Sequence, residues 1–258
     1  MLMQLAPSNI QPSWSPSSKL LPLKEGDVHI WSFHTSRPSK DVESLCKVIS
    51  PEEMNRAMRM RSLEVREQAI VSRAVLRLFL SGYLGVTPLQ LQFSTTGMGK
   101  PMLQGTGLHF NLSHSHGIGL LAITRIAEIG VDIEKIRHME NMLFLAQRFF
   151  SPWESHYLGS QEGADLGTVF FQAWTRKEAF LKANGHGIGF GLDRVEVALG
   201  RHESPRLRQV DGNMTEAASW TVLHLEPCKG FMGAAAIKVP NVRPLTWHWE
   251  GKELPQRG

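Results

Sequence analysis

The chain has 258 residues with a formal net charge of +4, and 42% of the residues are hydrophobic and 20% charged. This ordinary globular composition excludes a disordered, collagen-like or coiled-coil protein and provides a core for one large domain or two small ones. The small positive excess favours an anionic partner such as a nucleotide or an acidic protein, and it falls far short of the concentrated basic stripe that indicates nucleic acid.

Cysteine content and hydropathy indicate the setting in which the protein works. Cys46 and Cys228 lack the short spacing of a metal or redox motif, so we expect free thiols and a reducing, cytoplasmic location. No run reaches the roughly 18 to 20 apolar residues that span a bilayer, so we expect no membrane partner. Residues 1–24 are rich in Pro, Ser and Gln and are expected to form a flexible tail.

The first half of the chain alternates strand and helix signals. Residues 28–33 predict a strand, and Ser50-Pro51-Glu52-Glu53 supplies an N-cap, a proline at the first helical position and early acids for a helix. Helical spacing of apolar residues continues to about residue 84. Strands are predicted at 89–93 and then, as a β meander, at 108–112, 119–123 and 129–134.

The second half repeats this order without an obvious sequence repeat. Its patterns predict helices at 141–150, 152–157 and 168–183 and strands at 220–225 and 233–239. An order of strand, helix and strands in each half permits two similar α+β lobes, which we place at 25–126 and 127–242, with a C-terminal tail at 243–258.

The segment Gly97-Met98-Gly99-Lys100-Pro101 is predicted to be a loop. Its glycines let backbone amides approach a ligand, and the Lys100 ammonium group can face a phosphate. The segment lacks the spacing of a nucleotide P-loop and does not resemble a dinucleotide fingerprint. Taken alone, a plain turn is the better interpretation.

A second polar segment, Ser113-His114-Ser115-His116, is predicted to form a turn. Two imidazoles and two hydroxyls can donate to a phosphate. A zinc site using His114 and His116 is an alternative, but no third nitrogen or sulfur ligand lies at a helpful spacing. An ordinary polar turn explains the segment equally well.

Asp132 and Glu134 lie one residue apart in the predicted strand 129–134. Because side chains alternate along a strand, both carboxylates share one face, while Val131 and Ile133 point into a core. With a third carboxylate they could surround a hard cation such as Mg²⁺, which would predict a phosphorylated ligand. Taken alone, an exposed strand face is the commoner explanation.

Glu178 and Lys182 stand four residues apart on the predicted helix 168–183. Glutamate first is the favoured order for a helix-surface ion pair, and this alone accounts for them. Trp174 lies on the same helical row, which suits either the edge of a core or a wall beside a ligand.

Taken together, four phrases in this order resemble the 4′-phosphopantetheinyl transferases of the surfactin-synthetase-activating (Sfp) type. The family phrases are GKP, FNxSHS, GxDxE and WxxKEAxxK, and the resemblance extends from about residue 28 to 240. In this chain the phrases stand as Gly99-Lys100-Pro101, Phe110-Asn111-Leu112-Ser113-His114-Ser115, Gly130-Val131-Asp132-Ile133-Glu134 and Trp174-Thr175-Arg176-Lys177-Glu178-Ala179-Phe180-Leu181-Lys182.

The resemblance implies a fold and an activity. The fold would be a pseudo-dimer in one chain, two similar α/β lobes with coenzyme A in the cleft between them, and a monomer in solution. The activity would be transfer of 4′-phosphopantetheine from coenzyme A to a serine of an acyl or peptidyl carrier protein, with release of adenosine 3′,5′-bisphosphate. The serine would belong to the partner, in keeping with the lack of a nucleophile elbow in this chain.

The resemblance also implies roles for particular residues. Asp132, Glu134 and Glu178 would hold Mg²⁺, or Mn²⁺ in its place, and Glu178 would take the proton of the serine directly or through a water molecule. Lys182 would contact the pyrophosphate, where Asp132 and Glu178 also bind coenzyme A. The remaining coenzyme A contacts would come from Arg56, Thr95, Thr96, Lys100, Ser113 and His114.

Some of these assignments have alternatives. Arg59 could replace Arg56, whereas Arg73 and Arg77 are interpreted as packing or carrier-facing residues. A metal-dependent hydrolase of a nucleotide pyrophosphate could use the same acidic cluster with water in place of serine. A non-catalytic module that binds coenzyme A or a carrier is a further alternative, although binding alone would not need three carboxylates together.

Overall fold

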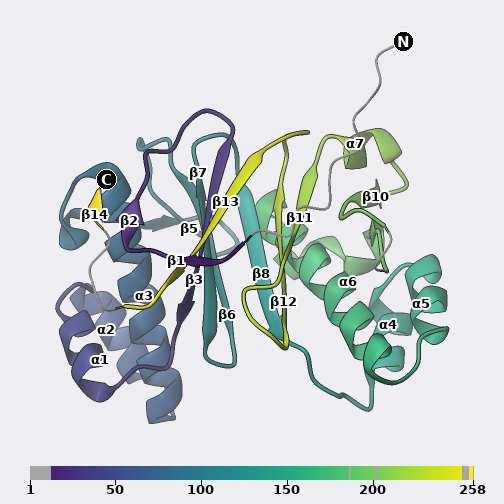
Figure 1. Ribbon diagram of the computed structural model, residues 1–258, viewed down its shortest axis with the longest axis horizontal. Helices are drawn as coiled ribbons and strands as arrows, with labels where there is room; N and C mark the ends of the chain where they lie inside the picture. Colours follow the sequence, from purple (N-terminus) through teal and green to yellow (C-terminus); the bar gives the residue numbers. More distant parts are fainter. Residues whose placement is uncertain (1–12, 186, 201–202, 252–255, 258) are drawn as a thin grey trace.

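The computed structural model describes residues 13–185, 187–200, 203–251 and 256–257, and it is a layered structure of helices and sheets. Figure 1 shows the helices of the first half on one side, those of the second half on the other, and the strands between them. The helices are α1 (Ser39–Cys46), α2 (Pro51–Met58), α3 (Leu63–Leu84), α4 (Met142–Phe149), α5 (Pro152–Gly159), α6 (Gly163–Asn184) and α7 (Met214–Ala218).

The larger sheet has five strands and mixes both halves of the chain. The parallel strand β13 lies between β1 and β3, while β7 is antiparallel to both β3 and β6. In spatial order its strands are β1 (Ser15–Pro16), β13 (Arg243–Trp249), β3 (Asp27–His34), β7 (Ile118–Thr124) and β6 (His109–Ser115).

A second, antiparallel sheet of three strands carries the acidic motif on its edge strand β8. Its order is β11 (Thr221–Leu225), β12 (Phe231–Ile237) and β8 (Ile129–Lys135). Two-stranded pairs complete the structure: β9 (Val195–Val197) with β10 (Leu207–Val210), β4 (Ser94–Thr95) with β5 (Pro101–Met102), and β2 (Lys19–Leu20) with β14 (Gln256–Arg257).

Three apolar cores hold these layers together. One lies between α3 and the five-stranded sheet, around Phe79, and a second lies between α6 and the three-stranded sheet, around Phe180. The third lies between the two sheets and includes Ile30, Leu120 and Val131. Strand β7 therefore contacts a core on both faces, which explains its nearly continuous apolar sequence, whereas β8 contributes Ile129, Val131 and Ile133 to the third core alone.

The two halves share a local design that comparison of single residues does not reveal. Helices α2 and α5 each begin with a capping box, Ser50 with Glu53 and Ser151 with Glu154, and each has proline in its first turn. Helices α3 and α6 are each 22 residues long, and each ends at a glycine in the left-handed conformation. The similarity between the two halves is therefore found in the lengths and the capping of their helices and not in matching residues.

In each half the capping glutamate also anchors the long helix. Glu53 accepts from Arg77 of α3, with 2.6 Å between Oε2 and Nε, and Glu154 accepts from Lys177 of α6, with 2.6 Å between Oε2 and Nζ. The side chains of Glu154 and Lys177 are both 0% exposed. Each short helix is therefore fixed to its long helix by an ion pair as well as by apolar packing.

Two expectations from the sequence are wrong. Residues 243–249 of the predicted tail 243–258 are not a tail, because they form β13, which pairs in register with β3, and the Trp247 ring stacks on Trp31 at 4.8 Å. Residues 252–255 and 258 lie outside the described part of the chain. The predicted tail 1–24 likewise contains β1, which pairs with β13, whereas residues 1–12 lie outside the described part of the chain. The partners are more than 200 residues apart, and no local pattern reports such a pairing.

The predicted strand 89–93 is a further correction. Residues Pro88–Gln90 form a short 3-10 helix, η1, because the Gln90 side chain accepts from the Thr87 amide at 2.8 Å and caps the turn. Polar–apolar alternation over five residues was therefore outweighed by local capping. No helix in the described residues has the length and apolarity needed to cross a membrane.

Candidate active site

The candidate site lies where β6, β8 and α6 meet, and Gly130 permits this meeting. A Cβ atom at Gly130 would collide with the Ala179 carbonyl oxygen and the Ala183 amide nitrogen of α6. Glycine therefore lets α6 lie directly against β8. The close contact brings Glu178 and Lys182 beside the carboxylates of β8.

Asp132 is the buried centre of the site, with 5% of its surface exposed. Its Oδ1 atom accepts from Lys182 Nζ at 2.6 Å and from Ser113 Oγ at 2.9 Å. Its Oδ2 atom is buried and has no hydrogen-bond partner. Burial raises the pKa of Asp132, against the opposing effect of the Lys182 charge.

Glu134 and Glu178 complete the acidic group. Glu134 Oε2 accepts from Ser115 Oγ at 2.9 Å and from Arg137 Nη1 at 3.2 Å. The half-buried Glu178 has a raised pKa, first because of burial and then because of the negative charges of Asp132 and Glu134. The three carboxylates are thus electrostatic neighbours.

The three carboxylates do not converge on a single metal-binding position. Within the described residues, no cluster of three or more His, Cys, Asp or Glu side chains is arranged to hold a metal ion. Lys182 instead occupies one oxygen of Asp132, and the other oxygen remains without a partner. An all-oxygen group with an unsatisfied buried acceptor has the donor chemistry that a hard cation such as Mg²⁺ prefers.

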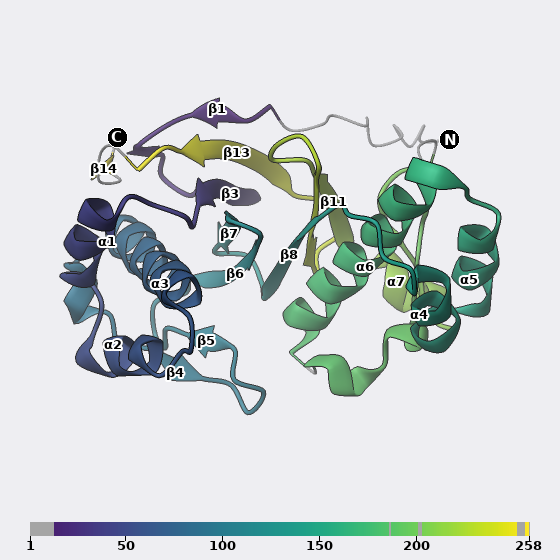
Figure 2. The same ribbon diagram turned by 90° about the horizontal axis from the view of Figure 1, so that it is seen from below.

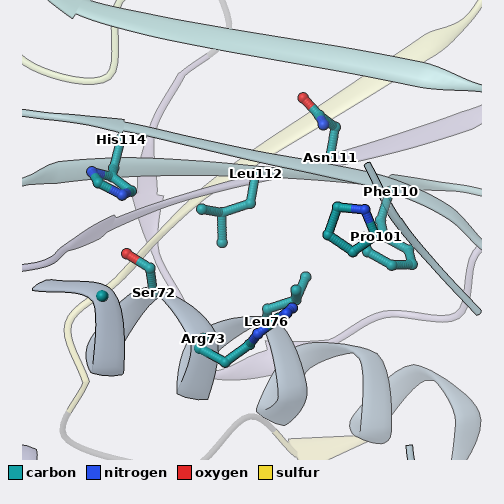
Figure 3. Close-up of a pocket in the computed structure, with 9 residues that line it drawn as sticks. Ser72, Arg73, Leu76, Pro101, Phe110, Asn111, Leu112 and His114 are labelled. Atoms are coloured by element: carbon teal, nitrogen blue, oxygen red, sulfur yellow. The ribbon is translucent and has the colours of Figure 1, made fainter. Parts of the chain in front are cut away.

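A cavity of about 260 Å³ lies between α3 and β6, and it is linked to β8 through the lining residue Asn111, which accepts from the Val131 amide. Figure 3 shows Ser72 and Arg73 of α3 facing Leu112 and His114 of β6 across it. Burial lowers the pKa of His114, and the Lys182 charge lowers it further. The hydroxyl of Ser72 is buried without a hydrogen-bond partner. The cavity therefore combines apolar walls with unsatisfied or cationic polar groups.

Lys100 sits at the rim of this region and is already paired. Its Nζ atom donates to Glu128 Oε2 at 2.6 Å and to the Ile129 carbonyl oxygen at 2.9 Å. Its amide donates to Thr96 Oγ1 at 3.1 Å, and Thr95 belongs to β4, so the predicted loop is the tip of the β4–β5 hairpin. The next residue, Pro101, lines the cavity.

The positions of the arginines differ from the order in which the sequence analysis ranked them as coenzyme A contacts. Arg56 does not line the cavity and lies on an exposed part of α2, whereas Arg73 does line it, with its guanidinium group paired to Glu53. Arg77 is buried and binds Glu53 and the Pro88 carbonyl oxygen, in agreement with a packing role. The position of Arg73 is set by the packing of α3 on β6, which the sequence does not report.

The structure thus gathers most of the predicted site. Asp132, Glu134, Glu178, Lys182 and Ser113 form one group, and His114 and the Lys100 hairpin flank the adjoining cavity. Sequence reasoning missed two side chains, Ser115 and Arg137, that bind Glu134. The predicted turn at 113–116 is wrong in part, because Ser113 and Ser115 belong to β6, and residues two apart on a strand share a face.

Comparison with known proteins agrees with this site. Residues 128–236 match the 4′-phosphopantetheinyl transferase superfamily, and residues 35–125 match the family described as 4′-phosphopantetheinyl transferase, N-terminal. The chain is 35% identical to the 4′-phosphopantetheinyl transferase HetI of Nostoc sp., over 93% of this chain and 100% of HetI.

Two transferases of bacilli are also similar. The chain is 34% identical to a 4′-phosphopantetheinyl transferase of Bacillus pumilus, over 67% of this chain and 73% of that protein. It is 30% identical to Sfp of Bacillus subtilis, over 67% of this chain and 77% of Sfp. The chain therefore belongs to the 4′-phosphopantetheinyl transferase superfamily.

Proposed function

We propose that this transferase moves 4′-phosphopantetheine from coenzyme A to a serine of an apo acyl or peptidyl carrier protein and releases adenosine 3′,5′-bisphosphate. The observation that carries the proposal is the group formed by Asp132, Glu134, Glu178 and Lys182, which adjoins a cavity lined by His114 and Arg73. The group suits a diphosphate and the cavity suits the nucleoside end of coenzyme A.

We infer that residues 25–126 and 127–242 form two similar lobes with coenzyme A bound in the cleft between them. The repeated capping boxes and the equal lengths of α3 and α6 support this division. Strand β13 extends the first lobe beyond the proposed boundary, because it returns to pair with β3.

The acidic group is proposed to hold Mg²⁺, for which Mn²⁺ could substitute. Asp132, Glu134 and Glu178 would be its ligands, and the unpartnered buried oxygen of Asp132 supports the fit. The raised pKa values of Asp132 and Glu178 support it too. A bound cation would offset the free-energy cost of holding these negative charges buried and close together. The bound cation would neutralise charge that develops on the diphosphate.

Two residues of α6 are proposed to carry the chemical step. The serine oxygen forms a bond to the β-phosphorus, and the bond from that phosphorus to the bridging oxygen breaks. Glu178 would take the serine proton directly or through a water molecule, because α6 places this carboxylate beside Asp132 and Glu134. Lys182 would leave its hydrogen bond to Asp132 and donate instead to the oxygen of the departing adenosine bisphosphate, whose negative charge it stabilises.

The nucleoside end is proposed to bind in the cavity between α3 and β6. His114 and Arg73 would contact the 3′-phosphate, with Arg73 in the place first expected for Arg56. Lys100 and the residues Thr95 and Thr96 would cover the ligand from the β4–β5 hairpin. Ser113 is proposed to act through Asp132, to which it donates.

The setting and the partner follow from chemistry. We infer a cytoplasmic monomer that meets its carrier protein transiently. Because carrier proteins of this kind are acidic, the net charge of +4 should speed encounter in a salt-sensitive manner.

A panel of apo acyl and peptidyl carriers tests this function. The purified chain with coenzyme A and Mg²⁺ should add the mass of one phosphopantetheine to at least one carrier, and a carrier whose acceptor serine is replaced by alanine should gain none. The Glu178→Gln variant should lower the rate by about 100-fold or more, as expected for loss of a general base. Equal cleavage of coenzyme A with and without carrier would instead indicate the pyrophosphate hydrolase.

A further inference from the structure

Strands β6 and β8 lie side by side although they belong to different sheets. Each is the edge strand of its own sheet, and no main-chain ladder joins them. In Figure 2, β8 lies between β6 and α6, so the contact of β6 with β8 is the seam between the two layers of strands. Something other than backbone pairing must hold this seam, because edge strands carry unpaired backbone groups.

Alternate side chains of β6 supply the missing connection. Asn111 Oδ1 accepts from the Val131 amide at 2.8 Å, Ser113 Oγ donates to Asp132 Oδ1 at 2.9 Å, and Ser115 Oγ donates to Glu134 Oε2 at 2.9 Å. The partners are 20, 19 and 19 residues apart, so the two strands run in the same direction. We call these three contacts the seam ladder. The partly buried seam thus joins both carboxylates of β8 to hydroxyls of β6.

Each carboxylate is held by one oxygen in the same manner. On Asp132 the contacts from Ser113 and Lys182 both end on Oδ1, and Oδ2 has no partner. On Glu134 the contacts from Ser115 and Arg137 both end on Oε2. One hydroxyl and one cationic side chain therefore bind the same oxygen of each carboxylate. The second oxygen is left for another ligand.

The neighbour of Ser115 fixes the direction of its hydrogen bond. Ser115 Oγ lies 2.9 Å from His116 Nδ1 as well as from Glu134, and a hydroxyl has one proton to donate. A carboxylate only accepts, so the hydroxyl donates to Glu134 and His116 Nδ1 donates to the hydroxyl. His116 is held at a φ of 46°, in the left-handed region, at the turn that follows β6. The hydrogen bond from His116 therefore orients the Ser115 hydroxyl toward Glu134 in the absence of a ligand.

We propose that Ser115 is a positioning residue that holds Glu134 for a divalent cation, as the outermost member of the seam ladder. The inference rests on the proposed function, because it concerns the cation of that same site. The hydroxyl does not touch the cation or the substrate. It restricts the Glu134 carboxylate to one orientation, which lowers the entropy lost when the free oxygen binds a cation.

The matched variants Ser115→Thr and Ser115→Val test this role. Threonine and valine have the same shape on a strand, but only threonine keeps the hydroxyl, so their difference isolates the hydrogen bond. We expect the valine variant to bind Mn²⁺ at least about tenfold more weakly than the threonine variant, as for loss of a residue that orients a metal ligand. Titration of the protein with Mn²⁺ alone, followed by electron paramagnetic resonance of the free ion, measures this affinity.

Two controls separate positioning from a structural role. Ser155→Ala removes a hydroxyl that donates to the Ala146 carbonyl oxygen at 2.7 Å in another part of the fold, and Mn²⁺ affinity should not change. The KM for coenzyme A at saturating Mg²⁺ should be similar in the two Ser115 variants, because the cavity beside α3 does not include this residue.

Equal Mn²⁺ affinity in the two Ser115 variants would overturn the proposal, as would a wild-type protein that binds no Mn²⁺. The titration uses neither carrier protein nor coenzyme A. A wild-type protein that binds Mn²⁺ but modifies no carrier would therefore contradict the proposed function and leave the result for Ser115 standing.

Discussion

Lys100 shows how single residues of this site are held before a ligand binds. Its ammonium group lies against Glu128, which also accepts from His109 Nδ1 at 2.7 Å. The side chain of Glu128 is 51% exposed, so water and a ligand phosphate can compete for the ion pair. When coenzyme A binds as proposed, Lys100 would thus replace the Glu128 carboxylate with a phosphate of the ligand.

Lys100→Ala should weaken coenzyme A binding more than it slows the chemical step. Loss of one charged hydrogen bond to phosphate should raise the KM for coenzyme A about tenfold, with little change in kcat. Steady-state kinetics with a saturating apo carrier measures both constants.

Glu128→Gln is the matched control for this prediction. It removes the anion that competes for Lys100, so the KM for coenzyme A should fall. A rise in KM would show that Glu128 is needed to place Lys100 and does not compete with the ligand.

At the scale of elements, the α5–α6 pair explains how the acidic helix is fixed. Lys177 lies one residue before Glu178 and points away from the site into the core, where it binds Glu154 and the carbonyl oxygens of Leu192 and Val195. Burial lowers the pKa of Lys177 and raises that of Glu154, so each charge depends on its partner. This anchor fixes the rotation of α6 and hence the side to which Glu178 points.

Lys177→Ala should destabilise the protein strongly. It leaves Glu154 buried without its counter-ion, and loss of one partner of a buried pair costs about 3 to 5 kcal/mol of unfolding free energy. Urea unfolding followed by circular dichroism measures the change.

Arg194→Ala provides the surface comparison. It removes the partner of Asp211 in a pair whose side chains are 50% and 43% exposed, so the unfolding midpoint should stay close to that of the wild type. A similar loss in both variants would contradict the difference that burial predicts.

At the scale of the whole molecule, the C-terminal strand returns to close the larger sheet. Between β13 and α3 lies His29, which is fully buried and in contact with Tyr83 at 2.7 Å and with the Trp247 ring. Burial lowers the pKa of His29 to about 4, although the nearby Asp27 opposes the shift. The neutral ring is thus part of the contact that joins the two ends of the chain.

Protein stability should therefore fall in mild acid. Between about pH 6.5 and pH 4 the unfolded chain binds a proton at His29 that the folded protein does not, so the unfolding free energy falls as pH falls through this window. A shift of this size corresponds to up to about 3 kcal/mol from this residue.

His29→Asn tests the assignment because a side-chain amide can replace Nδ1 in the hydrogen bond with the Tyr83 hydroxyl but does not titrate. Urea unfolding at several pH values should give a shallower dependence in this variant between pH 6.5 and pH 4. An unchanged slope would assign the loss of stability to other groups.

The sequence by itself determined the family, the residues of the acidic group and the starts of the short helices α2, α4 and α5, whereas α6 begins at Gly163 and not at the predicted residue 168. These features rest on local patterns: the four phrases, the alternation of Asp132 with Glu134, and the capping box at Ser50. Each depends on residues close in sequence, and for that reason each could be read without coordinates.

Only the tertiary structure decided how these parts meet. It showed that β13 completes the larger sheet, that Arg73 and not Arg56 lines the cavity, and that hydroxyls of β6 hold the carboxylates of β8. These contacts join residues from 19 to more than 200 positions apart, and they follow from the packing of the three cores. Local patterns do not encode such packing, because many long-range pairings satisfy the same alternation of apolar and polar residues.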